Sequence, residues 1–237
     1  MVISSKNYFH FTERIEFLRD ILENGFWPRY CIEYGWGKMN DFVIPMVCFC
    51  DIPLSQISEH TNFYGGWGIG VKPSWGKLHK DFTPVQYIAL TSTEFNFVKR
   101  LITSLKNGTI DAIGIKKLLL AKKVSGTAIT KSGRSSRKKF YDEREWRYVP
   151  FSLIQEKLII PLKNNIDFDT NECSKLTEHM KLPIEPQYIS YLIIPSERYR
   201  LKMIAELESI YSSNKHKDIL HILISRIVSL EQIKDDF

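Results

Sequence analysis

The sequence predicts an α+β fold in a single domain. Short apolar strands and amphipathic helices occur in separate stretches, and aromatic residues make up 13% of the 237 residues, enough for a substantial buried core. Hydrophobic residues at 43% and charged residues at 25% are ordinary for a globular protein, which excludes a wholly disordered chain. The sequence shows no internal repeat and no clean linker, so we expect residues 1–237 to form one domain.

The N-terminal part is predicted to alternate between strands and helices. Asn7–Phe11 is a short aromatic strand, and the side chain of Thr12 can cap the helix that follows. Apolar residues recur there at helical spacing until Gly25, which is placed to end the helix. The continuous apolar run Val43–Ile52 is typical of a buried strand, and Ser55–Tyr64 is predicted to be a short helix.

The remaining elements follow from the same apolar periodicity. The predicted strands are Pro84–Leu90, Tyr141–Pro150, Leu158–Leu162 and Ile189–Ile194. The predicted helices are Phe95–Leu105 and Glu197–Tyr211. Ile110–Ala121 is helical or irregular, Ser132–Arg137 is a polar loop, and Ile219–Leu230 is rich in strand.

Positive charge is concentrated in one segment. The chain has 33 basic and 27 acidic residues, and nine of the basic ones lie between Ile115 and Phe140, a window without an acidic residue. Outside that window 24 basic residues remain against 27 acidic ones, so the rest of the chain is mildly acidic. Such a segment can bind the phosphates of a nucleic acid or a nucleotide, or it can be a solvated, mobile loop.

The cysteine content and the hydropathy of the sequence indicate where in the cell the protein is located. Four cysteines in a chain of this size favour buried thiols over a disulfide framework, and their spacing does not support a zinc site. They are Cys31, Cys48, Cys50 and Cys173. No stretch approaches the roughly 20 apolar residues of a membrane span, and residues 1–10 lack the pattern of a secretory signal. We expect a cytoplasmic protein that binds no metal and no membrane.

Three segments could carry chemistry, and the first is the junction between the first strand and the first helix. His10 at that junction can donate a hydrogen bond to a ribose hydroxyl or a carbonyl group of a ligand. The alternative is a core histidine that is hydrogen-bonded to the backbone, which is the commoner situation for a single histidine.

The second segment joins a buried strand to a glycine-rich stretch. The strand ends near Asp51 and Ser55, and the next helix presents His60 and Tyr64 four residues apart, so these residues can form one wall of a pocket. The four glycines of residues 65–70 would let a ligand approach the backbone closely, although their spacing matches neither a dinucleotide-binding motif nor a P-loop. A tight turn with aromatic packing is the alternative.

The third segment combines carboxylates with aromatic residues. On a strand, Glu143, Glu145 and Arg147 share one face, and Trp146 and Tyr148 lie on the other. The two carboxylates repel each other, so we expect one to have a raised pKa or to await a cationic or hydroxylic ligand. The aromatic face is expected to be buried, which leaves the glutamates facing a cleft or water. A solvated strand of alternating charges is the alternative.

Four stretches together resemble the AbiGi family of abortive phage-resistance proteins. They are His10–Thr12, Pro28–Cys31, Pro45–Leu54 and Asp142–Tyr148. The resemblance extends over most of the chain, from about Tyr8 to about Pro195, and Pro45–Leu54 is its most specific part. It implies bacterial phage defence in a two-gene abortive-infection or toxin–antitoxin setting, in which this member is described as the antitoxin.

The order of the parts is also similar, less closely, to an ADP-ribosyltransferase. In that comparison His10 matches the histidine on the first strand, and Cys48–Asp51 with Ser55 and Tyr64 corresponds to the next conserved strand and helix. Glu143–Glu145 corresponds to the Glu-x-Glu of the catalytic strand. The similarity implies a mixed-sheet core with flanking helices, in which a basic loop, residues 115–140, is inserted before the Glu-x-Glu strand.

This second similarity implies a site for NAD as substrate. Cleavage of the bond between nicotinamide and ribose passes through an oxocarbenium-like state, which Glu145 would stabilise while Glu143 holds or deprotonates the acceptor. The implied NAD-binding residues are His10, Thr12, Ser55, Tyr64 and Arg144. Among them Tyr64 would stack on the nicotinamide, and Arg144 or the basic segment would meet the pyrophosphate.

Two functions of different classes follow. The first is an ADP-ribosyltransferase in phage defence that transfers ADP-ribose to a protein or nucleic acid. The second is a non-catalytic antitoxin or nucleotide-sensing module that neutralises a partner protein. In both cases the basic segment Lys116–Lys139 is expected to contact the partner, either a nucleic acid or a cognate toxin or antitoxin protein.

Overall fold

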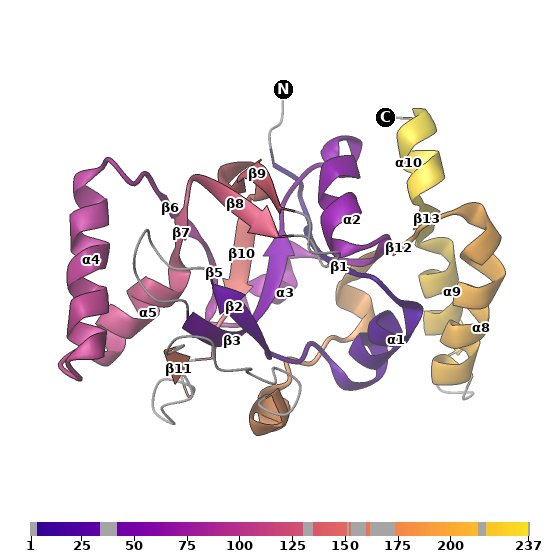
Figure 1. Ribbon diagram of the computed structural model, residues 1–237. Helices are drawn as coiled ribbons and strands as arrows, with labels where there is room; N and C mark the ends of the chain where they lie inside the picture. The colour runs from indigo at the N-terminus through magenta and orange to yellow at the C-terminus, as the bar shows by residue number, and fades with distance from the viewer. Residues whose placement is uncertain are drawn as a thin grey trace. The chain divides into compact units, whose positions relative to one another are not determined.

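The computed structural model describes residues 4–33, 42–129, 135–150, 152, 160–161, 174–212 and 217–236 (Figure 1). The chain divides into two compact units. The first unit comprises Met1–Phe26, Phe49–Lys80 and Leu182–Phe237, and the second comprises Trp27–Cys48 and Asp81–Lys181. Both units contain helices and strands, which confirms the predicted α+β class. One domain over residues 1–237 and a core like that of an ADP-ribosyltransferase both stay predictions.

A mixed sheet forms the centre of the first unit. Its strands are β1 (Tyr8–Thr12), β4 (Trp67–Val71), β12 (Ile189–Ile194), β13 (Ile227–Ser229) and the last two residues of β3 (Phe42–Cys50). The order is β13-β12-β4-β1, with β12 and β13 parallel and the other pairs antiparallel, and Phe9 of β1 pairs with Cys50. The predicted strands at the N-terminus and at residues 189–194 are confirmed.

Helices and 3₁₀ turns complete the first unit. The helices are α1 (Ile15–Asn24), α2 (Ser58–Tyr64), α3 (Pro73–Gly76), α8 (Arg200–Tyr211), α9 (Lys217–Ser225) and α10 (Leu230–Asp236), and the turns are η1 (Leu54–Gln56), η4 (Pro186–Tyr188) and η5 (Glu197–Tyr199). α1 ends where the sequence predicted, because the N–H of Gly25 donates to Ile21 O at a φ of 86°. Its cap differs from the prediction: Arg14 is the N-cap, and the Thr12 hydroxyl donates to Arg14 O.

One element of this unit contradicts the sequence prediction. Residues 219–230 were expected to be rich in strand, but α9 occupies Lys217–Ser225 and only Ile227–Ser229 is strand. Leu220 and Leu223 are buried and lie three residues apart, which is the spacing of one helix face.

A hydrophobic core cluster of the first unit consists of Phe9, Phe11, Cys50, Ile52, Ile57, Ile193, Leu230 and Ile233.

The second unit is built from short strands around a separate core. Its strands are β2 (Arg29–Glu33), most of β3, β5 (Phe82–Pro84), β6 (Gln86–Ile88), β7 (Ala121–Lys123), β8 (Ser125–Ile129), β9 (Ser135–Lys139), β10 (Glu145–Tyr148) and β11 (Ile160–Pro161). β10 lies between β3 and β5, β2 and β11 pair with β3, and β6–β7 and β8–β9 are two-stranded. The helices are α4 (Thr93–Lys106) and α5 (Ala112–Leu120), and the 3₁₀ turns are η2 (Phe140–Glu143) and η3 (Lys175–Met180).

A hydrophobic cluster packs α4 and α5 against these strands. Its buried members are Ile44, Met46, Ile88, Val98, Ile102, Leu118, Leu119, Ala121, Val149 and Met180. Ser92 caps α4 by accepting from Phe95 N–H, and Asp111 caps α5 by accepting from Gly114 N–H. α4 confirms the helix predicted at Phe95–Leu105. α5 shows that Ile110–Ala121 is largely helical rather than irregular.

The described parts of the basic segment, residues 115–129 and 135–140, do not form the predicted loop. They contain the end of α5, all of β7 and the antiparallel ribbon β8–β9, in which five residue pairs run from Ser125↔Lys139 to Ile129↔Ser135. Backbone hydrogen bonding orders this polar stretch although few of its residues are apolar. The predicted loop at Ser132–Arg137 falls partly outside the described residues, and its described part belongs to β9.

Two further predicted strands differ from the observed elements. Pro84–Leu90 is divided between β5 and β6, and Tyr141–Pro150 is strand only at Glu145–Tyr148. Within the described parts of the chain, no helix is both long enough and apolar enough to cross a membrane.

Candidate functional site

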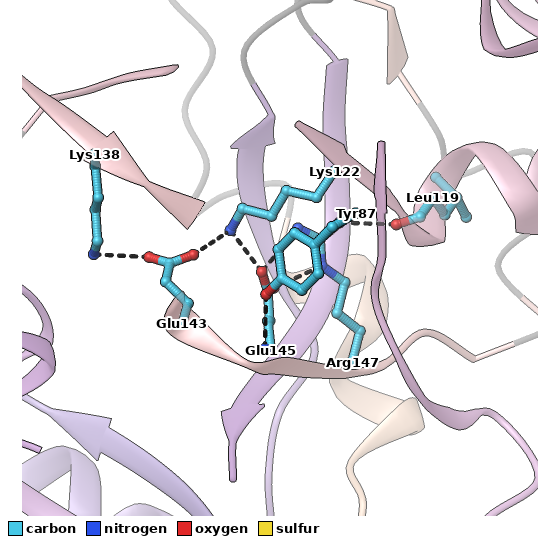
Figure 2. A network of polar contacts seen from close by, with 7 residues as sticks. All are labelled: Tyr87, Leu119, Lys122, Lys138, Glu143, Glu145 and Arg147. Carbon is cyan, nitrogen blue, oxygen red and sulfur yellow. Dashed lines mark hydrogen bonds and ion pairs between the residues drawn. The ribbon is translucent and has the colours of Figure 1, made fainter. Parts of the chain in front are cut away.

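The two glutamates of the Glu-x-Glu motif lie next to each other at the start of β10 (Figure 2). Glu143 ends η2 and Glu145 opens the strand. Arg144 between them adopts a left-handed conformation with φ 47° and ψ 50°. Such a residue redirects the chain sharply, so both carboxylates can approach the same cation. Their exposed fractions are only 4% and 6%.

Three cations of the same unit contact these carboxylates. Lys122 on β7 donates from Nζ to Glu143 Oε2 at 2.7 Å and to Glu145 Oε2 at 2.5 Å. Lys138 Nζ on β9 lies 2.8 Å from Glu143 Oε1. Arg147 Nε on β10 donates to Glu145 Oε1 at 2.6 Å. We call these five residues the buried charge cluster.

Neutral groups extend the buried charge cluster at both ends. Arg147 Nη1 donates to Leu119 O at 2.8 Å, and Glu145 N–H donates to the Tyr87 hydroxyl at 2.8 Å. Figure 2 shows the side chains of Tyr87, Lys122 and Arg147 converging on Glu145 from different strands. β6, β7 and β10 are thereby joined by polar contacts as well as by packing.

The electrostatics of the buried charge cluster keep both glutamates ionised. Burial raises the pKa of Glu145, but Arg147 and Lys122 outweigh it and hold that pKa well below its ordinary value. Burial likewise raises the pKa of Glu143, and Lys122 and Lys138 bring it below the ordinary value. Of the two alternatives expected for this pair, a raised pKa is therefore wrong, and a carboxylate that awaits a ligand stays a prediction.

Two neighbouring groups end with a raised pKa, because there no cation outweighs the effect of burial. Burial raises the pKa of the Tyr87 phenol, and it raises the pKa of the Cys48 thiol well above its ordinary value. Both groups are therefore neutral at physiological pH, so the glutamates are the ionised acids among these residues.

The face of β10 that is buried is the opposite of the one predicted. Glu143, Glu145 and Arg147 were expected to face a cleft or water, yet Arg147 is fully buried, while Trp146 and Tyr148 are half-buried. The physical reason is that cations from β7 and β9 neutralise the glutamates, which removes most of the penalty for burying them. Trp146 stacks instead on Phe82 with a centroid distance of 5.4 Å.

The predicted NAD-binding residues of the first unit have different surroundings. The ring of His10 lies 5.5 Å from both Phe26 and Phe49, measured between centroids, so it packs among aromatic side chains. Ser55 is exposed on η1. Tyr64 is 39% exposed at the end of α2, and its ring centroid lies 4.5 Å from that of His60, so the two side chains share one helix face; that they form a pocket wall stays a prediction.

The candidate residues therefore fall into two groups. His10, Thr12, Ser55 and Tyr64 belong to the first unit, and Glu143, Arg144 and Glu145 belong to the second. A common NAD site formed by all seven stays a prediction.

The glycine-rich stretch is filled by the protein itself rather than open to a ligand. A Cβ at Gly68 would lie 2.7 Å from the ring of Phe11, and one at Gly70 would lie 2.7 Å from the ring of Phe9. At Gly65, whose φ is 105°, a Cβ would collide with the carbonyl oxygen of Thr12. The glycines thus make room for β1 and its aromatic side chains, which is the packing alternative of the sequence analysis.

Two residues of the site were not singled out from the sequence. Lys122 and Lys138 were counted only as members of a basic segment, because Lys122 is 21 residues from Glu143 and the spacing of Lys138 from Glu143 matches no helix or strand pairing rule. The sequence signal that could have found them is the absence of acidic residues between Ile115 and Phe140. The nine cations of that window must either pair with carboxylates elsewhere in the chain or stay solvated.

In the parts of the chain that are described, no group of three or more His, Cys, Asp or Glu side chains is placed to hold a metal ion. Cys31, Cys48 and Cys50 form no disulfide; Cys50 is buried as predicted, Cys31 and Cys48 are half-buried, and Cys173 lies outside the described residues.

Comparisons with known proteins add a family. A family profile described as "Putative abortive phage resistance protein AbiGi, antitoxin" matches residues 24–195. The "Abortive phage resistance protein AbiGi" of Lactococcus lactis subsp. cremoris is 28% identical over 261 residues, which cover 96% of this chain and 98% of that protein. No solved structure matches. Since the family profile matches well over half of the present chain, the chain belongs to the AbiGi family of abortive phage resistance proteins.

Proposed function

We propose that this chain acts in abortive phage resistance as an antitoxin that binds and neutralises a partner protein, without transferring ADP-ribose. The description of its family supports this role. The observation that carries the non-catalytic part is the occupancy of the Glu-x-Glu motif. All four carboxylate oxygens of Glu143 and Glu145 have a cationic partner from the same unit within 3.3 Å.

This occupancy conflicts with the chemistry of ADP-ribose transfer. A catalytic carboxylate must lie beside the ribose carbon at which positive charge develops. Glu145 would first have to break its ion pairs with Arg147 and Lys122. The fully buried guanidinium of Arg147 would then have no counter-ion. Breaking one side of a buried ion pair costs about 3–5 kcal/mol. The arrangement is therefore better suited to holding the second unit together than to turnover.

ADP-ribose transfer with NAD as substrate is the second candidate. The observation in its favour is Tyr64, whose partly exposed ring, packed on His60, offers a face on which nicotinamide can stack. This candidate requires NAD binding to displace Arg147 from Glu145.

A growth experiment separates the two candidates. The chain and the product of its adjacent gene are expressed from separate inducible promoters in a bacterial host, alone and together. An antitoxin leaves growth unchanged when expressed alone and restores growth when the toxic neighbour is induced. Growth arrest by this chain alone, with release of nicotinamide from NAD by the purified protein, would contradict the proposal and support the transferase.

A further inference from the structure

The β8–β9 ribbon has two faces of different composition. In its antiparallel register Ser125 pairs with Lys139 and Thr127 pairs with Arg137. Successive residues of a strand point to opposite faces, so these four share one face and Lys138 lies on the other. We call the face formed by Ser125, Thr127, Arg137 and Lys139 the outward face.

The inner face is committed to the fold. Lys138 is largely buried and contacts Glu143 at 2.8 Å within the buried charge cluster. The ring of Phe140 covers Gly126 so closely that a Cβ there would lie 2.9 Å from it. The inner face is thus neutralised and packed, and it fixes the orientation of the ribbon within the second unit.

The outward face keeps its positive charge. Arg137 and Thr127 are exposed, and Lys139 is 71% exposed. Lys139 has one acidic neighbour, Asp142 at 4.0 Å, but that side chain is 63% exposed too, and such surface pairs contribute little. No ion pair joins Arg137 to a carboxylate in the parts of the chain that the structure describes.

The chemistry of the outward face favours phosphate over a protein surface. Each of its four side chains carries a hydroxyl, an ammonium or a guanidinium, and all of these are donors to phosphate oxygens. Protein interfaces are instead centred on aromatic residues and other large apolar anchors together with Arg, and Lys and Ser are depleted in them, so of the four residues only Arg137 is typical of such an interface. None of the four residues is aromatic or apolar.

The spacing fits a polymer of phosphates. Arg137 and Lys139 are two residues apart on a strand, or about 6.6 Å, which is close to two axial steps of about 3.4 Å along one nucleic-acid strand. We infer that the outward face binds the sugar–phosphate backbone of a nucleic acid without reading its base sequence. This inference does not depend on the proposed antitoxin function.

Fluorescence anisotropy with the full-length protein tests this inference. The probes are a labelled single-stranded RNA and a labelled duplex DNA, each of about 20 nucleotides per strand, titrated from roughly 50 to 200 mM KCl. The wild-type Kd should rise with salt. Arg137→Ala with Lys139→Ala should weaken binding about tenfold or more at low salt. It should also lower the slope of log Kd against log salt by about 1.4 with RNA or about 1.8 with DNA.

Two control variants make the result specific. Lys99→Ala with Arg100→Ala removes two exposed cations from α4, the same change in charge, and should leave the slope unchanged. The double variant Arg137→Lys with Lys139→Arg keeps both positive charges and should bind as tightly as the wild type. Equal losses in both alanine pairs would overturn the inference, as would the absence of salt-dependent binding by the wild type. Equally tight binding of an oligoglutamate of matched charge would also overturn it, since an acidic protein segment would then satisfy the face.

Discussion

Glu145 and Arg147 occupy the same face of β10 and form an ion pair, with Arg147 Nε 2.6 Å from Glu145 Oε1 and Arg147 fully buried. Residues two apart on a strand point the same way, so the strand geometry itself brings them together. Arg147 also donates to Leu119 O at the end of α5. The second glutamate of the Glu-x-Glu motif is thereby part of the core of the second unit.

Acid should weaken the fold through Glu143. Its pKa is lowered in the folded protein, so its contribution to stability is present above the unfolded pKa of about 4.3 and is lost as the pH falls through the folded pKa. The free energy of unfolding, measured in urea at several pH values, should therefore fall below about pH 5, and less steeply in Glu143→Gln. Asp142→Asn, which changes an exposed neighbour, should retain the wild-type slope. Identical slopes in the wild type and in Glu143→Gln would refute this assignment.

A double-mutant cycle should show that Lys138 and Glu143 are energetically coupled. Lys138→Met and Glu143→Gln should give a coupling energy of about 1–3 kcal/mol in urea unfolding, because Glu143 is buried and the Lys138 side chain is only 16% exposed. The pair Lys139 and Asp142 in the same region is exposed, at 4.0 Å, and should couple by less than about 0.5 kcal/mol. Equal coupling in the two cycles would mean that burial does not set the strength of the first pair.

Gly65→Ala should destabilise the first unit more than backbone strain alone explains. Gly65 and Gly108 both have positive φ values, 105° and 70°, but a Cβ at Gly108 has nothing within 4 Å. Gly108→Ala should cost about 1–2 kcal/mol, the penalty for a left-handed residue with a Cβ. Gly65→Ala should cost at least twice as much in the same unfolding assay, since its Cβ meets Thr12 O. If Gly65→Ala and Gly108→Ala lowered the free energy of unfolding equally, the backbone of β1 at Thr12 could shift to accommodate the added Cβ at little cost.

His10 and Tyr64 should differ in their effect on stability. His10→Ala removes a ring packed against both Phe26 and Phe49 and should lower the free energy of unfolding by about 1–3 kcal/mol. Tyr64→Ala removes a partly exposed ring and should cost less than about 1 kcal/mol. Thermal melts with and without NAD provide the measurement. If both variants melt like the wild type and both lose stabilisation by NAD, the two side chains serve a ligand instead.

Features with a local cause could be predicted from the sequence. The stop of α1 at Gly25 and the contact between His60 and Tyr64 depend only on residues within one or two helical turns. The thiols Cys31, Cys48 and Cys50 followed from composition and length. Such features need no knowledge of which strands pair.

The misassigned face of β10 shows what local reasoning lacks. A strand that alternates charged and aromatic residues is normally buried on its aromatic side, because unpaired charges are costly in a core. Here Lys122 lies 23 residues before Glu145 along the chain, and only the pairing of β6 with β7 brings it within reach. Lys122 therefore becomes the partner of Glu145 through the tertiary structure. The spacing of Glu143, Glu145 and Arg147 along the chain does not predict this contact.

The central claim is that Glu145 stabilises the fold rather than performing catalysis, and the unfolding free energy of Glu145→Gln tests it most directly. Removing the charge leaves Arg147 and Lys122 buried with one counter-ion fewer, so the variant should lose about 3–5 kcal/mol in urea unfolding. Glu208→Gln, on the exposed side of α8, should stay within about 0.5 kcal/mol of the wild type. The contradicting result is a Glu145→Gln protein as stable as the wild type that releases nicotinamide from NAD at least about 100-fold more slowly than the wild type does.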